Sequence, residues 1–173
     1  MTAEQTSLLP LRSQVKNSMK LKLIDFGVST RYLRTHPTSN NEVHIQPRVT
    51  SNFYGNYAFA SPNAHRRNVL TRRDDFYCIV YFISNLLTHQ LLFFDRGDND
   101  FDNSVEAAAS LKLNLKPREF LTDPRNKCLI PFAEYVYSLD FAEEPNYNKM
   151  KFLITKNILD HNLVPNFKYD WNF

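Results

Sequence analysis

A stretch of 19 residues without a charged side chain, residues 76–94, constrains the fold of this chain more than any other feature. Its length is compatible with a membrane span, but five polar residues lie inside it: Ser84, Asn85, Thr88, His89 and Gln90. The bilayer centre holds no water that would satisfy such side chains. A helix that is apolar on nearly all sides is otherwise found at the centre of a helical domain. We therefore expect a buried central helix over about 72–88.

Hydrophobic periodicity and capping residues predict further helices, and a mainly α-helical domain. A short helix is expected after Ser61, with Pro62 at its first position. Three longer helices are expected over about 104–113, 126–139 and 146–159. At 173 residues and 43% hydrophobic composition, the chain is able to bury one globular core.

Residues 20–29, KLKLIDFGVS, contain the tripeptide Asp25-Phe26-Gly27. The apolar residues before it alternate with or follow lysines, which predicts a half-buried strand over 20–24 that ends at Asp25. In protein kinases this tripeptide serves the nucleotide, because its aspartate holds Mg²⁺ against the ATP phosphates. Asp25 is therefore the candidate metal ligand, and Asp25, Phe26 and Gly27 are the candidate cofactor-binding residues. The alternative is a capped turn after a strand, since three residues alone are a weak motif.

Further motifs follow the tripeptide in a fixed order. After an irregular tract to about residue 63, which overlaps SPNAH at residues 61–65, RRDD at residues 72–75 opens the apolar helix, and the chain ends in YDWNF. These pieces, with Ser-x-Asn-x-His in place of Ala-Pro-Glu, resemble the casein kinase 1 family of Ser/Thr protein kinases. The resemblance covers about residues 20–173. It implies a kinase C-terminal lobe, mainly α, with a short β element before Asp25 and the N-lobe missing.

Three elements that protein kinases need do not occur in the sequence: the glycine-rich loop, the third-strand lysine and the HRD catalytic loop. The three glycines, Gly27, Gly55 and Gly97, are too far apart to cradle a phosphate, and none of the five histidines precedes Arg-Asp. We expect a flexible leader over 1–18 and a partial kinase domain over 19–173. The resemblance implies ATP and Mg²⁺ as cofactors of the complete parent, whereas this chain alone is expected to be inactive.

The resemblance also assigns a peptide-binding loop. Its Gly-Thr pair corresponds to Gly55 and Asn56, and the family's anion-binding arginine corresponds to Ala58. Arg34 and Arg48 are the candidates to replace part of the lost positive charge, so these two arginines, Gly55 and Asn56 form the predicted substrate-binding set. The loss of the family's arginine weakens the case for recognition of phosphorylated residues.

Five positions match structural residues of the family: Ser61, His65, Arg72, Arg73 and Asp75. Asp75 matches the central-helix aspartate that anchors the catalytic loop, and its alternative role is that of an exposed acid in the first turn of a helix. The paired arginines have a solvated pair as their alternative. Ser61, His65 and Asp74 also contain the residue types of a hydrolase triad, but no nucleophile elbow or oxyanion loop accompanies them.

Charge is distributed unevenly along the chain. Residues 1–73 carry 11 Lys and Arg against three acidic residues, a net of +8, whereas residues 74–173 have a net charge of −5. This pattern fits either two ordinary solvated surfaces or a basic groove for acidic protein. The expected partner is a protein, either an acidic substrate or the missing kinase half. No nucleic-acid or membrane partner is expected. Cys78 and Cys128 are isolated, which favours free thiols in an intracellular, cytoplasmic or nuclear protein.

Two functional hypotheses from different classes stay open. The chain is either part of an enzyme whose activity belongs to a complete kinase domain, or a non-catalytic pseudokinase-type module that binds another protein. For the fold, the alternative is an unrelated helical domain in which the tripeptide occurs by chance.

Overall fold

The computed structural model describes residues 22–94 and 101–160. The predicted leader (1–18), residues 20 and 21 of the predicted strand, residues 95–100 and the YDWNF ending lie outside these ranges. The described elements are β1 (Leu33–Thr35), β2 (Glu42–His44), α1 (Pro62–His65), α2 (Arg72–Thr88), α3 (Phe101–Asn114), α4 (Pro117–Phe120), the 3₁₀ helix η1 (Lys127–Leu129), α5 (Ile130–Ser138) and α6 (Tyr147–Asp160). The expectation of a mainly helical protein is confirmed.

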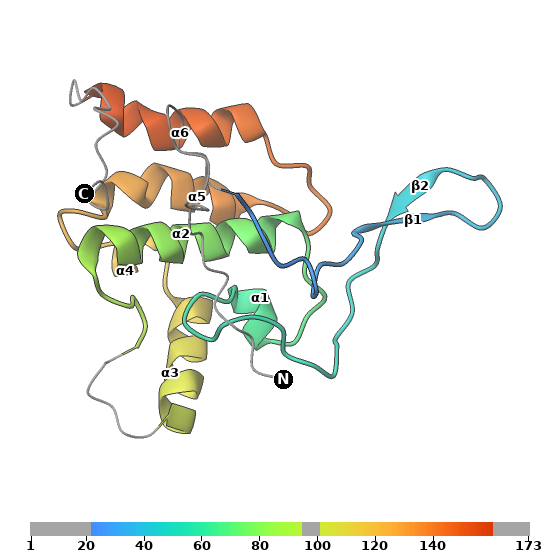
Figure 1. Cartoon of the computed structure of the whole chain (residues 1–173), viewed down its shortest axis with the longest axis horizontal. Coiled ribbons are helices and arrows are strands. Elements are labelled where there is room, and N and C mark those ends of the chain that lie inside the picture. The colour runs from blue at the N-terminus through green and yellow to red at the C-terminus, as the bar shows by residue number, and fades with distance from the viewer. Residues whose placement is uncertain (1–21, 95–100, 161–173) are drawn as a thin grey trace, which may run out of the picture.

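Three helices form successive layers, with α5 between α2 and α6 (Figure 1). Helix α3 lies below this stack in Figure 1, runs roughly perpendicular to its helices, and contacts α1. The hairpin formed by β1 and β2 projects away from the helical body (Figure 1). Helix α5 is therefore the middle layer, and α2, which the sequence predicted as the buried central helix, packs against one side of it with a partly buried surface.

Helix α2 starts and stops where its sequence directs. The backbone N–H of Thr71, the residue before the helix, donates to Asp74 Oδ2 at 2.8 Å, which satisfies a polar group at the helix start. Asp74 and Asp75 place negative charge in the first turn, where the helix dipole favours it. The helix ends at His89, whose left-handed backbone (φ 57°) turns its N–H onto the Asn85 carbonyl at 2.7 Å.

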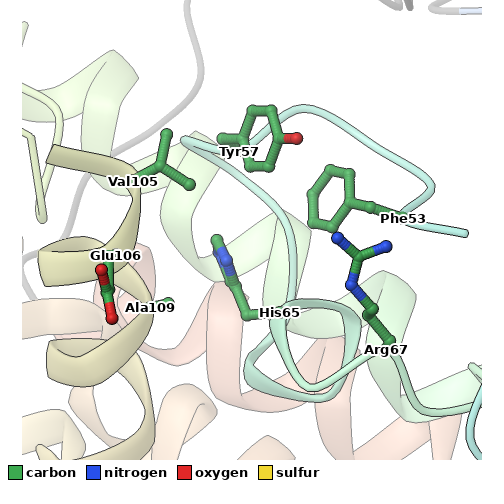
Figure 2. A pocket seen from close by; sticks show the side chains of 7 residues that line it. All are labelled: Phe53, Tyr57, His65, Arg67, Val105, Glu106 and Ala109. Atoms are coloured by element: carbon green, nitrogen blue, oxygen red, sulfur yellow. The ribbon is translucent and has the colours of Figure 1, made fainter. Parts of the chain in front are cut away.

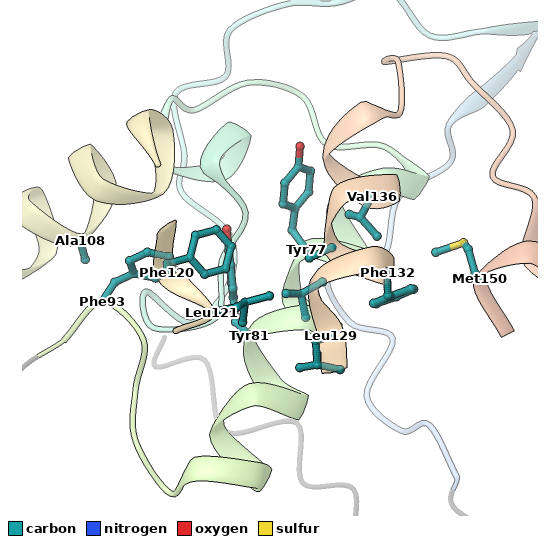
Figure 3. Close-up of a cluster of buried hydrophobic side chains, with 12 residues drawn as sticks. Tyr77, Tyr81, Phe93, Ala108, Phe120, Leu121, Leu129, Phe132, Val136 and Met150 are labelled. Carbon is teal, nitrogen blue, oxygen red and sulfur yellow. The ribbon is translucent and has the colours of Figure 1, made fainter. Parts of the chain in front are cut away.

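The hydrophobic core lies where α5 meets α2, α4 and α6 (Figure 3). Val80, Tyr81, Leu121, Phe132 and Val136 are all at most 2% exposed. Aromatic rings extend this core with edge-on contacts, among them Tyr81 with Phe93, whose ring centroids lie 5.3 Å apart. The Tyr81 hydroxyl also meets the Tyr137 hydroxyl at 2.8 Å, so its polar end is satisfied inside the core.

The helix predictions are confirmed, and the strand prediction is wrong in the part described. Residues 22–24 form no strand, and Asp25 follows an extended coil. A lone strand has no ladder for its backbone groups, and no neighbouring segment of the described chain supplies one here. The short helix α4 was not predicted from the sequence; Pro117 opens it, and its buried Phe120 joins the core.

The tract that follows the tripeptide is not wholly irregular. β1 and β2 pair antiparallel, with Leu33 opposite His44 and Thr35 opposite Glu42. The six-residue turn between them is closed by the His36 N–H donating to the Asn41 carbonyl at 2.7 Å. The sequence predicted only an irregular tract here, because the two three-residue strands are too short to give an alternating pattern.

Two further findings concern the described helices and the cysteines. Within the described ranges, no helix combines the length and apolar character that crossing a membrane requires. Cys78 and Cys128 are both free thiols. Burial raises the pKa of the Cys78 thiol to about 12, so this group is inert rather than reactive.

Candidate functional site

Asp25 lies in a tight surface turn. The Gly27 N–H donates to Asp25 Oδ1 at 3.2 Å, and the Ser29 N–H and hydroxyl donate to the Phe26 carbonyl at 3.0 and 2.7 Å. The Asp25 backbone is left-handed (φ 63°), a conformation that aspartate tolerates better than most residues. Asp25, Phe26 and Gly27 are all exposed. The structure thus shows the capped turn that was the alternative for this motif, without a strand before it.

The turn fits one part of a magnesium site. Asp25 Oδ1 is engaged within the turn, while Oδ2 has no hydrogen bond to any described residue, and Mg²⁺ usually takes one or two carboxylates together with phosphate and water oxygens. No group of three His, Cys, Asp or Glu side chains converges within 22–94 and 101–160. The residues present therefore offer one hard oxygen ligand and no cradle for a nucleotide's phosphates.

Gly55 and Asn56, two of the four predicted substrate-binding residues, lie in a folded loop, residues 53–60, here named the aromatic loop. Gly55 has φ 122°, a conformation that side chains disfavour. The Asn56 carbonyl accepts the N–H groups of Phe59 and Ala60 at 3.0 and 2.7 Å, and its side-chain Oδ1 accepts the Ala58 N–H at 2.9 Å. Gly55 and Asn56 are exposed. They shape the loop, and their role in binding stays a prediction.

Asp74 is a buried anchor that the sequence interpretation did not identify. Its Oδ1 accepts hydrogen bonds from the Ser61 hydroxyl (2.7 Å) and the Asn63 amide (2.8 Å), and its Oδ2 accepts the Thr71 N–H. Ser61 also caps α1 by accepting the Ala64 N–H at 3.1 Å. One carboxylate thus joins the start of α1 to the start of α2. The Ser61 hydroxyl donates to Asp74, and Ser61 is 1% exposed, so this serine is not placed as the nucleophile of a hydrolase triad.

The environment of Asp75 differs from that of Asp74. The residue is exposed and makes no hydrogen bond or ion pair with any described residue. Its carboxyl is nevertheless partly desolvated, and this desolvation, together with the neighbouring Asp74 carboxylate, raises its pKa. The position that matches the family's loop-anchoring aspartate therefore holds a carboxyl that has no hydrogen-bond partner among the described residues.

Arg72 and Arg73 are not a solvated pair. The Arg73 guanidinium donates to the Leu139 carbonyl at 2.8 Å, and the Arg72 guanidinium donates to the Ala142 carbonyl at 3.2 Å. Arg72 also lies over the Tyr32 ring, 4.5 Å from its centroid. The two arginines therefore fasten the segment after α5, and the base of the hairpin, to the start of α2.

Arg34 and Arg48, the predicted charge replacements, are both exposed. Arg34 lies on β1, whereas Arg48 lies in the segment whose backbone pairs with residues 67–69. Neither guanidinium forms an ion pair with another described side chain. They are available for an acidic ligand, but no contact shown by the structure brings them together into one pocket.

Lys112 is a second group that sequence reasoning missed. This lysine of α3 is 1% exposed, and its ammonium donates to the carbonyls of Tyr57, Ala58 and Ala60 at 2.7, 3.0 and 2.9 Å. His65 Nε2 lies 3.2 Å from the same nitrogen. Nothing in the pattern SLKLN distinguishes this lysine from a solvated one, so the sequence carried no signal for it.

A cavity of about 280 Å³ lies between the aromatic loop and α3 (Figure 2). Its lining combines two aromatic rings, three polar or charged side chains and two small apolar ones: Phe53, Tyr57, His65, Arg67, Glu106, Val105 and Ala109. Of the predicted structural residues, only His65 contributes to it.

The burial of His65 makes stability depend on pH. Desolvation and the nearby Lys112 charge lower its pKa from 6.5 to about 4, against a backbone hydrogen bond to Tyr57 that raises it. As pH falls, His65 therefore takes up its proton at a higher pH in the unfolded protein than in the folded protein. The free energy of unfolding that His65 contributes is fully present above pH 6.5 and is lost as pH falls toward 4. Allowing for partial exposure, we expect a loss of about 1 to 2 kcal/mol between pH 7 and pH 4.5. Urea unfolding at both pH values measures it.

Two variants distinguish the contribution of His65 to the pH dependence of stability from the contributions of other titrating groups. His65→Gln is expected to remove this part of the pH dependence, whereas His36→Gln, at an exposed histidine, is expected to retain it. Equal pH dependence in the parent protein and His65→Gln would show that the assignment to His65 is wrong.

Comparison with curated proteins matches the chain to protein kinases. An inactive tau-tubulin kinase of Caenorhabditis elegans is 26% identical over 159 residues, which are 90% of this chain and 53% of that protein. A probable casein kinase I homologue of Encephalitozoon cuniculi is 29% identical over 138 residues, 79% of this chain and 42% of that protein. No protein-family model matches the chain.

These matches support a kinase-lobe fold for the helical body. The chain spans about half the length of the curated relatives it matches. ATP and Mg²⁺ are implied for kinases of this kind, while the described residues contain no complete nucleotide site. The resemblance is thus confirmed: this chain is a distant relative of the casein kinase 1 group of protein kinases over most of its length.

Proposed function

We propose that this chain is the C-terminal-lobe part of a casein kinase 1-type Ser/Thr kinase domain, inactive alone, whose phosphorylation of protein by ATP belongs to the complete domain. The observation that carries this proposal is the match of most of the chain to only about half of two kinases. The uncovered carboxyl of Asp75 supports it, since that position is where the family's catalytic loop would attach.

In the complete domain, Asp25 would supply one carboxylate ligand to Mg²⁺, and the metal would neutralise charge on the transferred phosphate. The sequence given provides neither a base for the substrate hydroxyl nor a lysine for the phosphates. A general base alone is worth roughly a hundredfold to ten-thousandfold in rate, so the chain by itself is expected to show no phosphoryl transfer.

The expected substrate is an acidic protein inside the cell. The exposed guanidinium groups of Arg34 and Arg48, in the basic first part of the chain, support this choice. The two free thiols are consistent with a reducing compartment.

A fusion tests the proposal. The N-terminal half of the E. cuniculi casein kinase I homologue is joined upstream of residue 19, and nucleotide binding is measured by calorimetry with and without Mg²⁺. We expect Mg²⁺-dependent ATP binding that Asp25→Asn weakens at least about tenfold, a factor that corresponds to about 1.4 kcal/mol. Asp140→Asn, at another exposed acid, is the matched control and is expected to bind as the parent fusion does.

The outcomes distinguish the parts of the proposal. A folded fusion that binds ATP equally well with Asn at position 25 would exclude Asp25 as a metal ligand. A fusion that is folded by circular dichroism but binds no nucleotide would exclude the hypothesis that the complete domain is an active kinase.

That last result would favour a second candidate, a non-catalytic module that binds protein. The exposed apolar side chains around the tripeptide favour it: Leu23, Ile24, Phe26 and Val28 are each 45–69% exposed. Exposed apolar surface beyond scattered single residues commonly marks a protein contact. One of the two matched relatives is itself named as inactive, which is consistent with a role without catalysis.

A further inference from the structure

The ammonium of Lys112 is buried without an acidic partner. Its four nearest polar partners are three backbone carbonyls and the His65 ring, and no carboxylate among the described residues forms an ion pair with it. Burying a charge is costly unless hydrogen bonds replace its water. The three carbonyls replace that water, since an ammonium has three N–H donors. The position of Lys112 in the last turn of α3 adds the favourable end of the helix dipole.

The carbonyls converge on Lys112 because the aromatic loop turns its amides inward. The N–H groups of Ala58, Phe59 and Ala60 are all taken up by Asn56. The carbonyls of residues 57, 58 and 60 then face α3, where no backbone donor is free to meet them. A single lysine satisfies all three, so the loop conformation and the buried charge depend on each other.

This contact fixes one wall of the cavity in Figure 2. The Tyr57 ring, next to a carbonyl held by Lys112, stacks on Phe53 with centroids 4.2 Å apart and planes inclined by 14°. Val105 and Ala109 of α3 form the opposite wall. Lys112 is therefore the direct link between the helix and the loop that face each other across this cavity.

The geometry does not favour a role for the Lys112 amine as a base or nucleophile. Burial lowers its pKa from 10.5 to about 7, as in lysines that act as bases or nucleophiles. The nitrogen is, however, surrounded by four acceptors, and the residue is 1% exposed. The carbonyls favour the charged form, and no face of the amine is open to a substrate.

We propose that Lys112 is a positioning residue, which holds the aromatic loop, with Gly55 and Asn56, in the conformation that presents its rings to a peptide. The peptide-binding part of this statement rests on the proposed function, whereas the positioning part stands on the contacts alone. The experiment therefore measures the loop itself and requires no kinase activity.

The test is chemical rescue of Lys112→Ala, followed by amide hydrogen exchange in the full chain. We expect exchange at residues 58–60 to accelerate at least about a hundredfold relative to the parent. Added n-propylammonium, which replaces the missing side chain, is expected to restore most of the protection. n-Propanol of similar size is expected to restore none, because it lacks the three donors and the charge.

Two controls complete the design. Lys151→Ala removes an exposed lysine on α6 and is expected to leave exchange at 58–60 unchanged. Exchange in α5 reports whether Lys112→Ala still folds; if it does not, the rescue is measured as recovery of helical circular dichroism. Unchanged protection at 58–60 in folded Lys112→Ala, or equal rescue by the amine and the alcohol, would overturn the proposal.

Discussion

Replacing Asp74 by alanine is expected to destabilise the protein by about 3 to 5 kcal/mol. The Asp74 side chain accepts hydrogen bonds from Ser61, Asn63 and the Thr71 backbone, and the residue is only 3% exposed. Its removal leaves three donors without an acceptor at the junction of α1 and α2, and hydrogen bonds to a charged group are worth about 1.5 to 3 kcal/mol each before the structure relaxes. Total stabilities are typically about 5 to 15 kcal/mol, so the loss is large. Urea unfolding followed by circular dichroism measures it.

Asp75→Asn is the matched control, since it changes the next carboxyl in the same helical turn. Asp75 has no described hydrogen bond, and its pKa is raised, so the folded protein gains little from its negative charge. We expect a change within about 0.5 kcal/mol, the usual range for surface substitutions. Equal losses for Asp74→Ala and Asp75→Asn would mean that the carboxylate anchor contributes nothing specific.

The contrast between these two aspartates shows what the sequence reveals and what it hides. The pattern RRDDF predicts the start of α2, because acids belong in a first turn and apolar residues follow at once. Successive helical residues differ in direction by about 100°, so one aspartate faces the core and the other does not. The resemblance pointed to Asp75, and only the structure shows Asp74 holding Ser61.

The helices were predictable because their signals are local. Pro62 stands at the first turn of α1, and the apolar run of α2 has a defined start and end. The strand before Asp25 was not, because a strand needs a partner and partners are set by distant sequence. The exposed Leu23 and Phe26 retain the apolar character that suggested a strand, but no described segment pairs with residues 22–24.

Lys112 marks the limit of inference from sequence in the candidate site. Its burial depends on carbonyls of residues 57, 58 and 60, more than 50 positions away, and carbonyls occur in every residue. The residue types in the sequence therefore do not predict such a contact. Asp25, in contrast, could be named as a candidate from its neighbours alone, since the tripeptide is contiguous, and its role as a metal ligand stays a prediction.

Phe132→Ala is expected to cost about 3 to 5 kcal/mol, the range for removing a fully buried phenylalanine. Phe132 lies on α5, in the layer between α2 and α6, and is 1% exposed (Figure 3). The loss combines the transfer of the ring's apolar surface with the cavity it leaves, and the packed helices on both sides limit how far that cavity closes. The midpoint of urea unfolding reports the change.

Phe152→Ala is the matched control, because this phenylalanine on α6 is 54% exposed. We expect it to change stability by less than about 1 kcal/mol, since it buries little additional surface on folding. The difference between the two variants measures the contribution of the layer in which α5 joins α2 to α6. If Phe132→Ala cost no more than Phe152→Ala, then α5 would not be the centre of this core, and the stacked arrangement of the three helices would be wrong.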